Sequence, residues 1–159
     1  MNAFILNHQE FDIEELFHHI HTKTKVELGE KARLAVQKCR DYLDDKISQT
    51  EENVYGINTG FGSLYDQSIS KNDLSKLQIN IVRSHACGTG SEVSSKIVKT
   101  MLLFKAIGLH YGHSGVQVAT IERLLYLYNN DILPVVYEQG SLGASGDLSP
   151  LAHISLVLL

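Results

Sequence analysis

Residues 140–150 read Gly140-Ser141-Leu142-Gly143-Ala144-Ser145-Gly146-Asp147-Leu148-Ser149-Pro150, and this stretch decides how the rest of the chain is interpreted. Glycines recur at every third position, after an apolar extended run and before a helix start. Glycine permits turns and close backbone approaches that a Cβ excludes. The stretch therefore predicts a tight loop that presents the small triplet Ala144-Ser145-Gly146.

This triplet has the composition that a backbone cyclisation requires. If the Gly146 amide nitrogen attacks the Ala144 carbonyl and water is lost, a five-membered imidazolone forms. Loss of the Ser145 hydroxyl as a second water then leaves an exocyclic methylidene, which is a strong electrophile. Gly146 lets its nitrogen approach without a Cβ clash, and a loop that holds the two groups so close stores strain.

On spacing alone, three other interpretations of the loop stay open. An ordinary glycine-rich connection needs the same residues for turn geometry. A phosphate cradle would use the following helix N-terminus, although the Gly-Lys-Ser/Thr ending of a P-loop is missing. A nucleophile elbow needs Gly-x-Ser-x-Gly, and Asp147 stands where its last glycine should be.

Two further blocks strengthen the first interpretation. They are Tyr55-Gly56-Ile57-Asn58-Thr59-Gly60-Phe61-Gly62 and Arg83-Ser84-His85-Ala86-Cys87-Gly88-Thr89-Gly90. With the sequence GSLGASGDLSPLAH from residue 140, they resemble the histidine and aromatic amino acid ammonia-lyases, in the same order and over nearly the whole chain. The resemblance implies that Ala144-Ser145-Gly146 becomes 4-methylidene-imidazol-5-one (MIO), with no external cofactor.

The resemblance also implies roles for single residues. In the family, the tyrosine that matches Tyr55 removes the β-proton of the substrate, although a free phenol loses its own proton only near about pH 10. His85 and Ser84 are expected to contact the substrate. The Ser-His pair resembles the histidine enzymes, and some bacterial tyrosine ammonia-lyases carry it too. Without the resemblance, Tyr55 is an ordinary packing residue and His85 a core histidine.

Four residues are expected to support the loops around the site. Gly60 and Gly62 suit a segment that covers the site, and Gly143 suits the turn before the triplet. Asp147 is expected to accept hydrogen bonds from loop amides and to hold the strained turn. These four residues are therefore interpreted as supports and not as catalysts.

No metal site is predicted. His110-x-x-His113 has helical metal-ligand spacing. Gly112 interrupts that helix, however, and no third ligand is evident.

The composition narrows the partners and the compartment. The chain has 159 residues, is 43% hydrophobic and 20% charged, and carries a net charge of −4. This mild acidic excess gives no electrostatic footprint for nucleic acid, and no apolar run is long enough to span a membrane. The start lacks a signal peptide, and two cysteines are too few for a disulfide framework. A cytoplasmic protein is expected, and the resemblance implies a small amino acid as its ligand.

The hydrophobic periodicity predicts a mainly α chain with short extended pieces near the motif loops. Asp12 and Glu15 indicate a capping box, Ser70 caps a helix that runs to about Ala86, and Ser149 caps a helix with Pro150 at its first position. A helix over 30–47 is expected to bury one face, made of Ala32, Ala35, Val36, Cys39, Tyr42 and Leu43. Further helices are expected from Val93 to Leu109 and from Val116 to Tyr128, with extended segments at 4–6, 54–57 and 132–137.

Residues 1–159 are interpreted as a single N-terminal fragment of a lyase domain. Ser155–Leu159 is an apolar helical run without a stop signal, and the resemblance implies the longer ammonia-lyase (fumarase/aspartase-like) fold. It also implies further active-site groups downstream and a homotetramer whose subunits share sites. The fragment alone is therefore expected to be inactive and to self-associate through exposed core surface.

The expected reaction is elimination of ammonia from L-histidine to give trans-urocanate. The alternative within the family is tyrosine or phenylalanine as substrate. An alternative of another class is a helical assembly module without chemistry.

Overall fold

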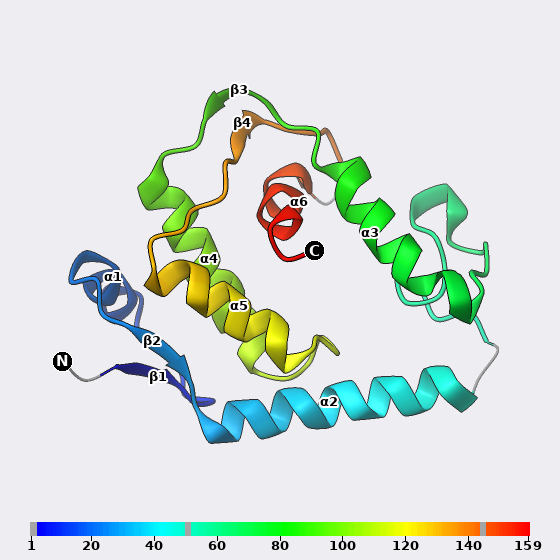
Figure 1. Cartoon of the computed structure of the whole chain (residues 1–159), viewed down its shortest axis with the longest axis horizontal. Helices are drawn as coiled ribbons and strands as arrows, with labels where there is room; N and C mark the ends of the chain where they lie inside the picture. The colour runs from blue at the N-terminus through cyan, green and yellow to red at the C-terminus, as the bar shows by residue number, and fades with distance from the viewer. Residues whose placement is uncertain (1–2, 50–51, 144–145) are drawn as a thin grey trace.

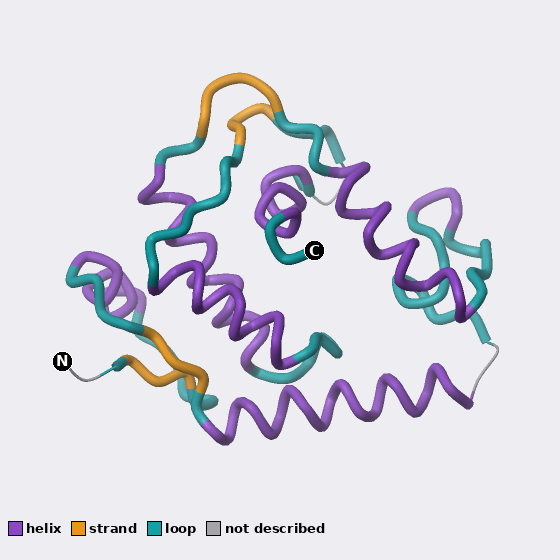
Figure 2. Tube along the Cα trace, viewed as in Figure 1, coloured by secondary structure: helices purple, strands orange, loops and turns teal. Residues whose placement is uncertain are grey.

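The computed structural model describes residues 3–49, 52–143 and 146–159. Over these residues the chain folds into six α-helices joined by short strands and loops, which confirms the mainly α prediction (Figure 1, Figure 2). In chain order the elements are β1 (Phe4–Leu6), α1 (Ile13–His21), β2 (Val26–Leu28), α2 (Glu30–Gln49), the short 3-10 helices η1 (Gly62–Leu64) and η2 (Lys71–Asp73), α3 (Leu74–His85), β3 (Thr89–Glu92), α4 (Ser95–His110), α5 (Val118–Asn129), β4 (Tyr137–Gln139) and α6 (Ser149–Leu156).

The hydrophobic core is centred on α4 and α5, which pack against each other (Figure 1). Both helices carry apolar residues at helical spacing, so one face of each is buried. Gly112 and Gly115 adopt positive φ in the connection between them, where a side chain would be strained. The largest fully buried apolar side chains of the core are those of Leu6, Val26, Val36, Leu102, Leu103, Ile121, Leu124, Tyr128, Val136 and Ile154.

Two small sheets tie distant segments to this core. β1 and β2 pair in parallel, with Phe4 opposite Val26, and β2 packs against α5. β3 and β4 pair antiparallel, with Thr89 opposite Gln139 and a register shift before Glu92. The second sheet brings the segment after α3 beside the segment that leads into the loop at residue 140.

Helix α3 lies on the opposite side of the molecule from α1, and α6 lies between α3 and the α4–α5 pair (Figure 1). α3 and α6 pack against each other. None of the described residues of α3 is fully buried, whereas α6 buries Ala152 and Ile154.

Three local predictions are wrong. Residues 54–57 form a turn and not an extended piece, because Asn58 Oδ1 accepts the Val54 N–H at 2.7 Å and the Val54 carbonyl accepts the amides of Ile57 and Asn58. Tyr42 is 67% exposed, because the far half of α2 extends beyond the core. Ser149 is the first residue of α6 and not its cap; its amide is bound by Asp147, two residues earlier.

Other helix ends agree with expectation or differ by a few residues. Asp12 caps α1, and its side chain accepts the Glu14 N–H at 2.7 Å. The helix that begins near Ser149 ends at Leu156 and does not continue to residue 159. Within the described ranges, no helix has both the length and the apolar character needed to cross a membrane.

Candidate functional site

Asp147 organises the loop at 140–148. Its Oδ1 accepts the Ser141 N–H at 2.8 Å, the Ser141 hydroxyl at 3.0 Å and the Ser149 N–H at 2.9 Å. One carboxylate thus joins the start of the loop to the first turn of α6. These bonds, led by that from the Ser141 N–H, lower the pKa of Asp147 below its usual value because they favour the charged form.

Two of the loop glycines leave no room for a side chain, and the third has a backbone conformation that favours glycine. A Cβ on Gly140 would overlap the Asp147 carboxylate, and a Cβ on Gly143 would lie 2.8 Å from the Gly146 carbonyl oxygen. Gly146 has a φ of +116°, a conformation that L side chains rarely adopt, and its N–H donates to the Gly143 carbonyl at 3.4 Å. Ala144 and Ser145, which carry the predicted cyclisation, lie outside the described residues.

Ser84 and His85 lie at the C-terminal end of α3. The His85 Nδ1 atom bonds to the Ile81 carbonyl at 2.8 Å, and the Ser84 hydroxyl donates to the same carbonyl at 3.0 Å. Because a carbonyl can only accept, the bond assigns the ring proton of neutral His85 to Nδ1. Nε2 is then the acceptor nitrogen that a ligand would meet.

The segment after α3 is bound to α6 through His153. The His153 Nε2 atom accepts the Gly88 N–H at 3.0 Å, and its ring stands edge-on to Tyr137 at 5.4 Å between centroids. Sequence patterns did not indicate this bond, because the two residues are 65 positions apart.

Tyr55 lies in the turn that precedes η1. Its side chain is 63% exposed and meets the Phe61 ring edge-on at 5.6 Å. Gly62 has a φ of +57°, and a Cβ on Gly60 would lie 2.5 Å from the Leu64 Cβ. Both glycines are therefore required by the geometry of this loop.

The structure brings some of the predicted residues together and separates others. The end of α3 and the loop at 140–148 lie side by side, because α3 packs on α6 and β3 pairs with β4. The segment after Tyr55 is instead tied to residues 68–69, where Thr59 pairs with Ser68 and the Ile69 N–H donates to the Asn58 carbonyl at 2.8 Å. Residues 68–70 line a hollow with Leu77 of α3, and this loop lies beside the start of α3 in Figure 1. In the described part of the chain, no hydrogen bond or ring contact links Tyr55 to His85 or to residues 140–148.

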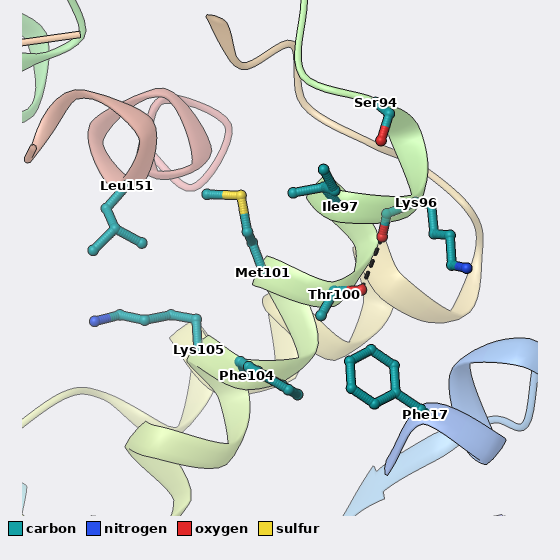
Figure 3. A pocket seen from close by; sticks show the side chains of 9 residues that line it. All are labelled: Phe17, Ser94, Lys96, Ile97, Thr100, Met101, Phe104, Lys105 and Leu151. Atoms are coloured by element: carbon teal, nitrogen blue, oxygen red, sulfur yellow. Dashed lines mark hydrogen bonds between the residues drawn. The ribbon is translucent and has the colours of Figure 1, made fainter. Parts of the chain in front are cut away.

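A separate apolar groove of about 710 Å³ lies between α1, α4 and α6. Figure 3 shows Met101 pointing toward Leu151 of α6, while Phe17 of α1 faces the α4 side. Phe17, Ile97, Phe104 and Leu151 are all partly exposed there. None of the predicted site residues lines this groove.

The His110-x-x-His113 pair does not form a chelate. His110 is fully buried and its Nδ1 bonds to the Ile107 carbonyl, whereas His113 is exposed. Burial lowers the pKa of His110, and the charge on nearby His8 acts in the same direction. Within residues 3–49, 52–143 and 146–159, no group of three His, Cys, Asp or Glu side chains is arranged to hold a metal ion.

This mainly helical fold, with its glycine loop next to the end of α3, is that of the aromatic amino acid lyases and aminomutases. A histidine ammonia-lyase from Trypanosoma cruzi superposes with a TM-score of 0.83 at 28% identity, over 99% of this chain and 30% of that one. A phenylalanine aminomutase from Pantoea agglomerans superposes with a TM-score of 0.89 at 28% identity, over 98% of this chain and 30% of that one.

Sequence comparison gives the same answer. The model of the family described as "Aromatic amino acid lyase" matches residues 11–159. The chain belongs to this family. A histidine ammonia-lyase from Clostridium tetani is 43% identical over 155 residues, which are 98% of this chain. The chain spans about 30% of the length of the curated relatives it matches.

Proposed function

We propose that this chain is the N-terminal part of a carbon–nitrogen lyase that releases ammonia from L-histidine and forms trans-urocanate. The observation that carries the proposal is the loop at 140–148, with Asp147 bound to Ser141 and Ser149. The match to relatives named histidine ammonia-lyase supports histidine as the substrate.

The prosthetic group of the proposal is MIO, made from Ala144-Ser145-Gly146 without an external cofactor. The neighbouring residues fit such a group: Gly146 has positive φ, and the Gly143 position has no space for a Cβ. When formed, the group supplies an electrophile that makes the substrate amine a better leaving group. α6 starts at Ser149, directly after the loop, so its N-terminal dipole favours negative charge there.

The remaining steps belong to side chains of this chain. The phenolic oxygen of Tyr55 takes the β-proton, the C–H electron pair becomes the new C=C bond, and the C–N bond breaks as ammonia leaves. His85 places the substrate side chain through Nε2, because its Nδ1 is bound to Ile81. Ser84 lies beside it and contributes to the same contact.

The proposal includes a homotetramer. Among the described residues Tyr55 contacts Phe61 and no residue of the loop or of the Ser84-His85 pair; a homotetramer in which a second subunit supplies the tyrosine would complete the proposed site. We therefore propose that residues 1–159 alone are inactive. Light scattering of the full-length protein would test this assembly.

A second candidate keeps the site and changes the substrate to tyrosine or phenylalanine. The likeness to a phenylalanine aminomutase favours including it. The two ring nitrogens of a histidine substrate and the hydroxyl of tyrosine can both hydrogen-bond to His85. The substrate distinction therefore needs a measurement.

The decisive experiment supplies histidine, tyrosine and phenylalanine separately to the full-length protein. Ammonia release and product absorbance are followed, and the amino acid is checked for isomerisation. The proposal expects ammonia and urocanate from histidine, and Ser145→Ala is expected to abolish nearly all of it. A helical assembly module without chemistry would give no ammonia from any substrate and would be insensitive to Ser145→Ala.

A further inference from the structure

One histidine joins three segments of the candidate site. His153 lies on α6, one helical turn after Ser149. Its Nε2 accepts the Gly88 N–H at 3.0 Å, and its ring packs edge-on against Tyr137 of β4. The ring thus contacts the helix after the loop, the segment after α3 and the strand before the loop.

The backbone at Gly88 lies close to two side chains of α6. A Cβ on Gly88 would lie 2.8 Å from the His153 Nε2 and 3.1 Å from the Ser149 hydroxyl oxygen. Ser149 is buried, and its hydroxyl has no hydrogen-bond partner among the described residues. Only a glycine lets the backbone of residue 88 approach α6 to this distance.

Next to each end of this contact, a neighbouring residue is hydrogen-bonded to a residue of the proposed site. On one side, the Cys87 N–H donates to the His85 carbonyl at 2.9 Å, so the backbone at residue 88 is tied to the end of α3. On the other side, the Ser149 backbone N–H donates to the Asp147 Oδ1 at 2.9 Å, one helical turn before His153 on α6. A short, continuous path therefore connects the Ser84-His85 pair to the loop that contains the Ala144-Ser145-Gly146 triplet.

We propose that His153 is a positioning residue that sets the distance between His85 and Asp147. This inference rests on the proposed function, because His153 itself touches no reacting atom. A displacement of about 1 Å between substrate and reacting groups can cost about a hundredfold in rate. The bond to Gly88 fixes the two elements against such a displacement.

Two substitutions separate the bond from the ring packing. Because Nε2 accepts a hydrogen bond from the Gly88 N–H, neutral His153 carries its own ring proton on Nδ1. His153→Gln can present a carbonyl oxygen as acceptor near the place of Nε2 but removes the ring. His153→Phe keeps a ring against Tyr137 but has no acceptor.

The experiment compares the full-length wild-type protein with both variants by steady-state kinetics on histidine and by intact mass. All three are expected to lack two waters, which shows that the triplet has cyclised. His153→Phe is expected to lower kcat about tenfold or more with a smaller change in KM. His153→Gln is expected to stay within about threefold of wild type, since it restores the acceptor.

Three results would overturn the inference: wild-type kinetics in His153→Phe, equal losses in both variants, or a mass showing that His153→Phe blocks cyclisation. If His153→Phe does not fold, Gly88→Ala tests the same contact from the other side. It is expected to cyclise fully and to lose kcat, and unchanged kinetics would contradict the proposal. An inactive wild-type protein would instead refute the proposed function.

Discussion

The α4–α5 pair and the region formed by α3 with its flanking loops are built on different principles. α4 and α5 bury most of their apolar residues, including Leu102 and Leu124. α3 buries none of its described residues fully, and Tyr55, Ser84 and Asp147 are all exposed. The first region is held by burial and the second by hydrogen bonds and glycine contacts. Stability and proposed chemistry therefore reside in different parts of the chain.

The apolar core around α4 and α5 also contains polar groups. The Lys99 ammonium bonds to Asp131 and lies 4.9 Å from the centre of the Tyr128 ring. The Tyr128 hydroxyl and the His110 Nε2 are buried without hydrogen-bond partners within the described residues. Unpaired buried polar groups reduce stability. Substitutions in the core can therefore either lower or raise the free energy of unfolding.

The largest effect is expected from Leu102→Ala in the 159-residue chain. Leu102 is fully buried, so its removal leaves a cavity and lowers the free energy of unfolding by about 2–5 kcal/mol. Leu34→Ala on α2 is the matched control, because Leu34 is 60% exposed; a change within about 0.5 kcal/mol is expected. Urea denaturation measures the free energy of unfolding of both variants. Similar losses in the two would contradict the claim that burial in the α4–α5 region stabilises the chain.

The next prediction concerns Asp147 in the full-length protein. Asp147→Ala removes the acceptor for Ser141 and Ser149, so the fraction of molecules that lack two waters is expected to fall severalfold. Asp147→Asn keeps an oxygen acceptor and is expected to retain most of the modification. Intact mass reports the fraction, and the thermal midpoint should change little in either variant. A large drop in that midpoint with full cyclisation would assign Asp147 to stability instead.

A smaller effect is expected from pH. Burial lowers the pKa of His110 in the folded chain, whereas an unfolded histidine titrates near about 6.5. Below that pH, His110 binds a proton in the unfolded chain but not in the folded chain. The stability of the folded chain is therefore retained above this pH and falls as pH decreases. The slope from His110 is at most about 1.4 kcal/mol per pH unit.

Denaturation at several pH values, in wild type and in His110→Gln, isolates this contribution. The slope between about pH 5 and 7 is expected to be shallower in the variant. Equal slopes would mean that His110 is not the group responsible.

The smallest effect is expected from Tyr128→Phe. The substitution removes a buried hydroxyl without a partner and keeps the ring beside Lys99. The free energy of unfolding is expected to stay the same or to rise by up to about 1 kcal/mol. A loss above about 1 kcal/mol in urea denaturation would show that the hydroxyl is satisfied in solution.

The core helices could be predicted from the sequence, because apolar spacing in α1, α2, α4 and α5 reflects a single buried face. The same rule failed for residues 54–57, where the Asn58 side chain binds the backbone at Val54 and forms a turn. It also failed at Tyr42, since periodicity does not show where a helix extends beyond the core. Local sequence patterns indicate which face of a segment is apolar. They do not show where the neighbouring elements that cover this face end.

The sequence predicted the three motifs of the candidate site, but not how they are arranged in space. The acceptor role of Asp147 could be anticipated from a short carboxylate in a glycine loop. The His153–Gly88 bond and the β3–β4 pairing join residues distant in sequence, and no local pattern encodes such contacts. The absence of a contact between Tyr55 and the described loop residues could not be predicted either, because motif order gives no distances.

The central claim is that Ala144-Ser145-Gly146 closes into an electrophilic ring in the full-length, assembled protein. Intact mass spectrometry of that protein tests it directly, with Ser145→Ala as the reference. The account predicts a wild-type mass lower than the sequence mass by two waters and a Ser145→Ala mass without this loss. A wild-type mass equal to that of the unmodified sequence would contradict the account.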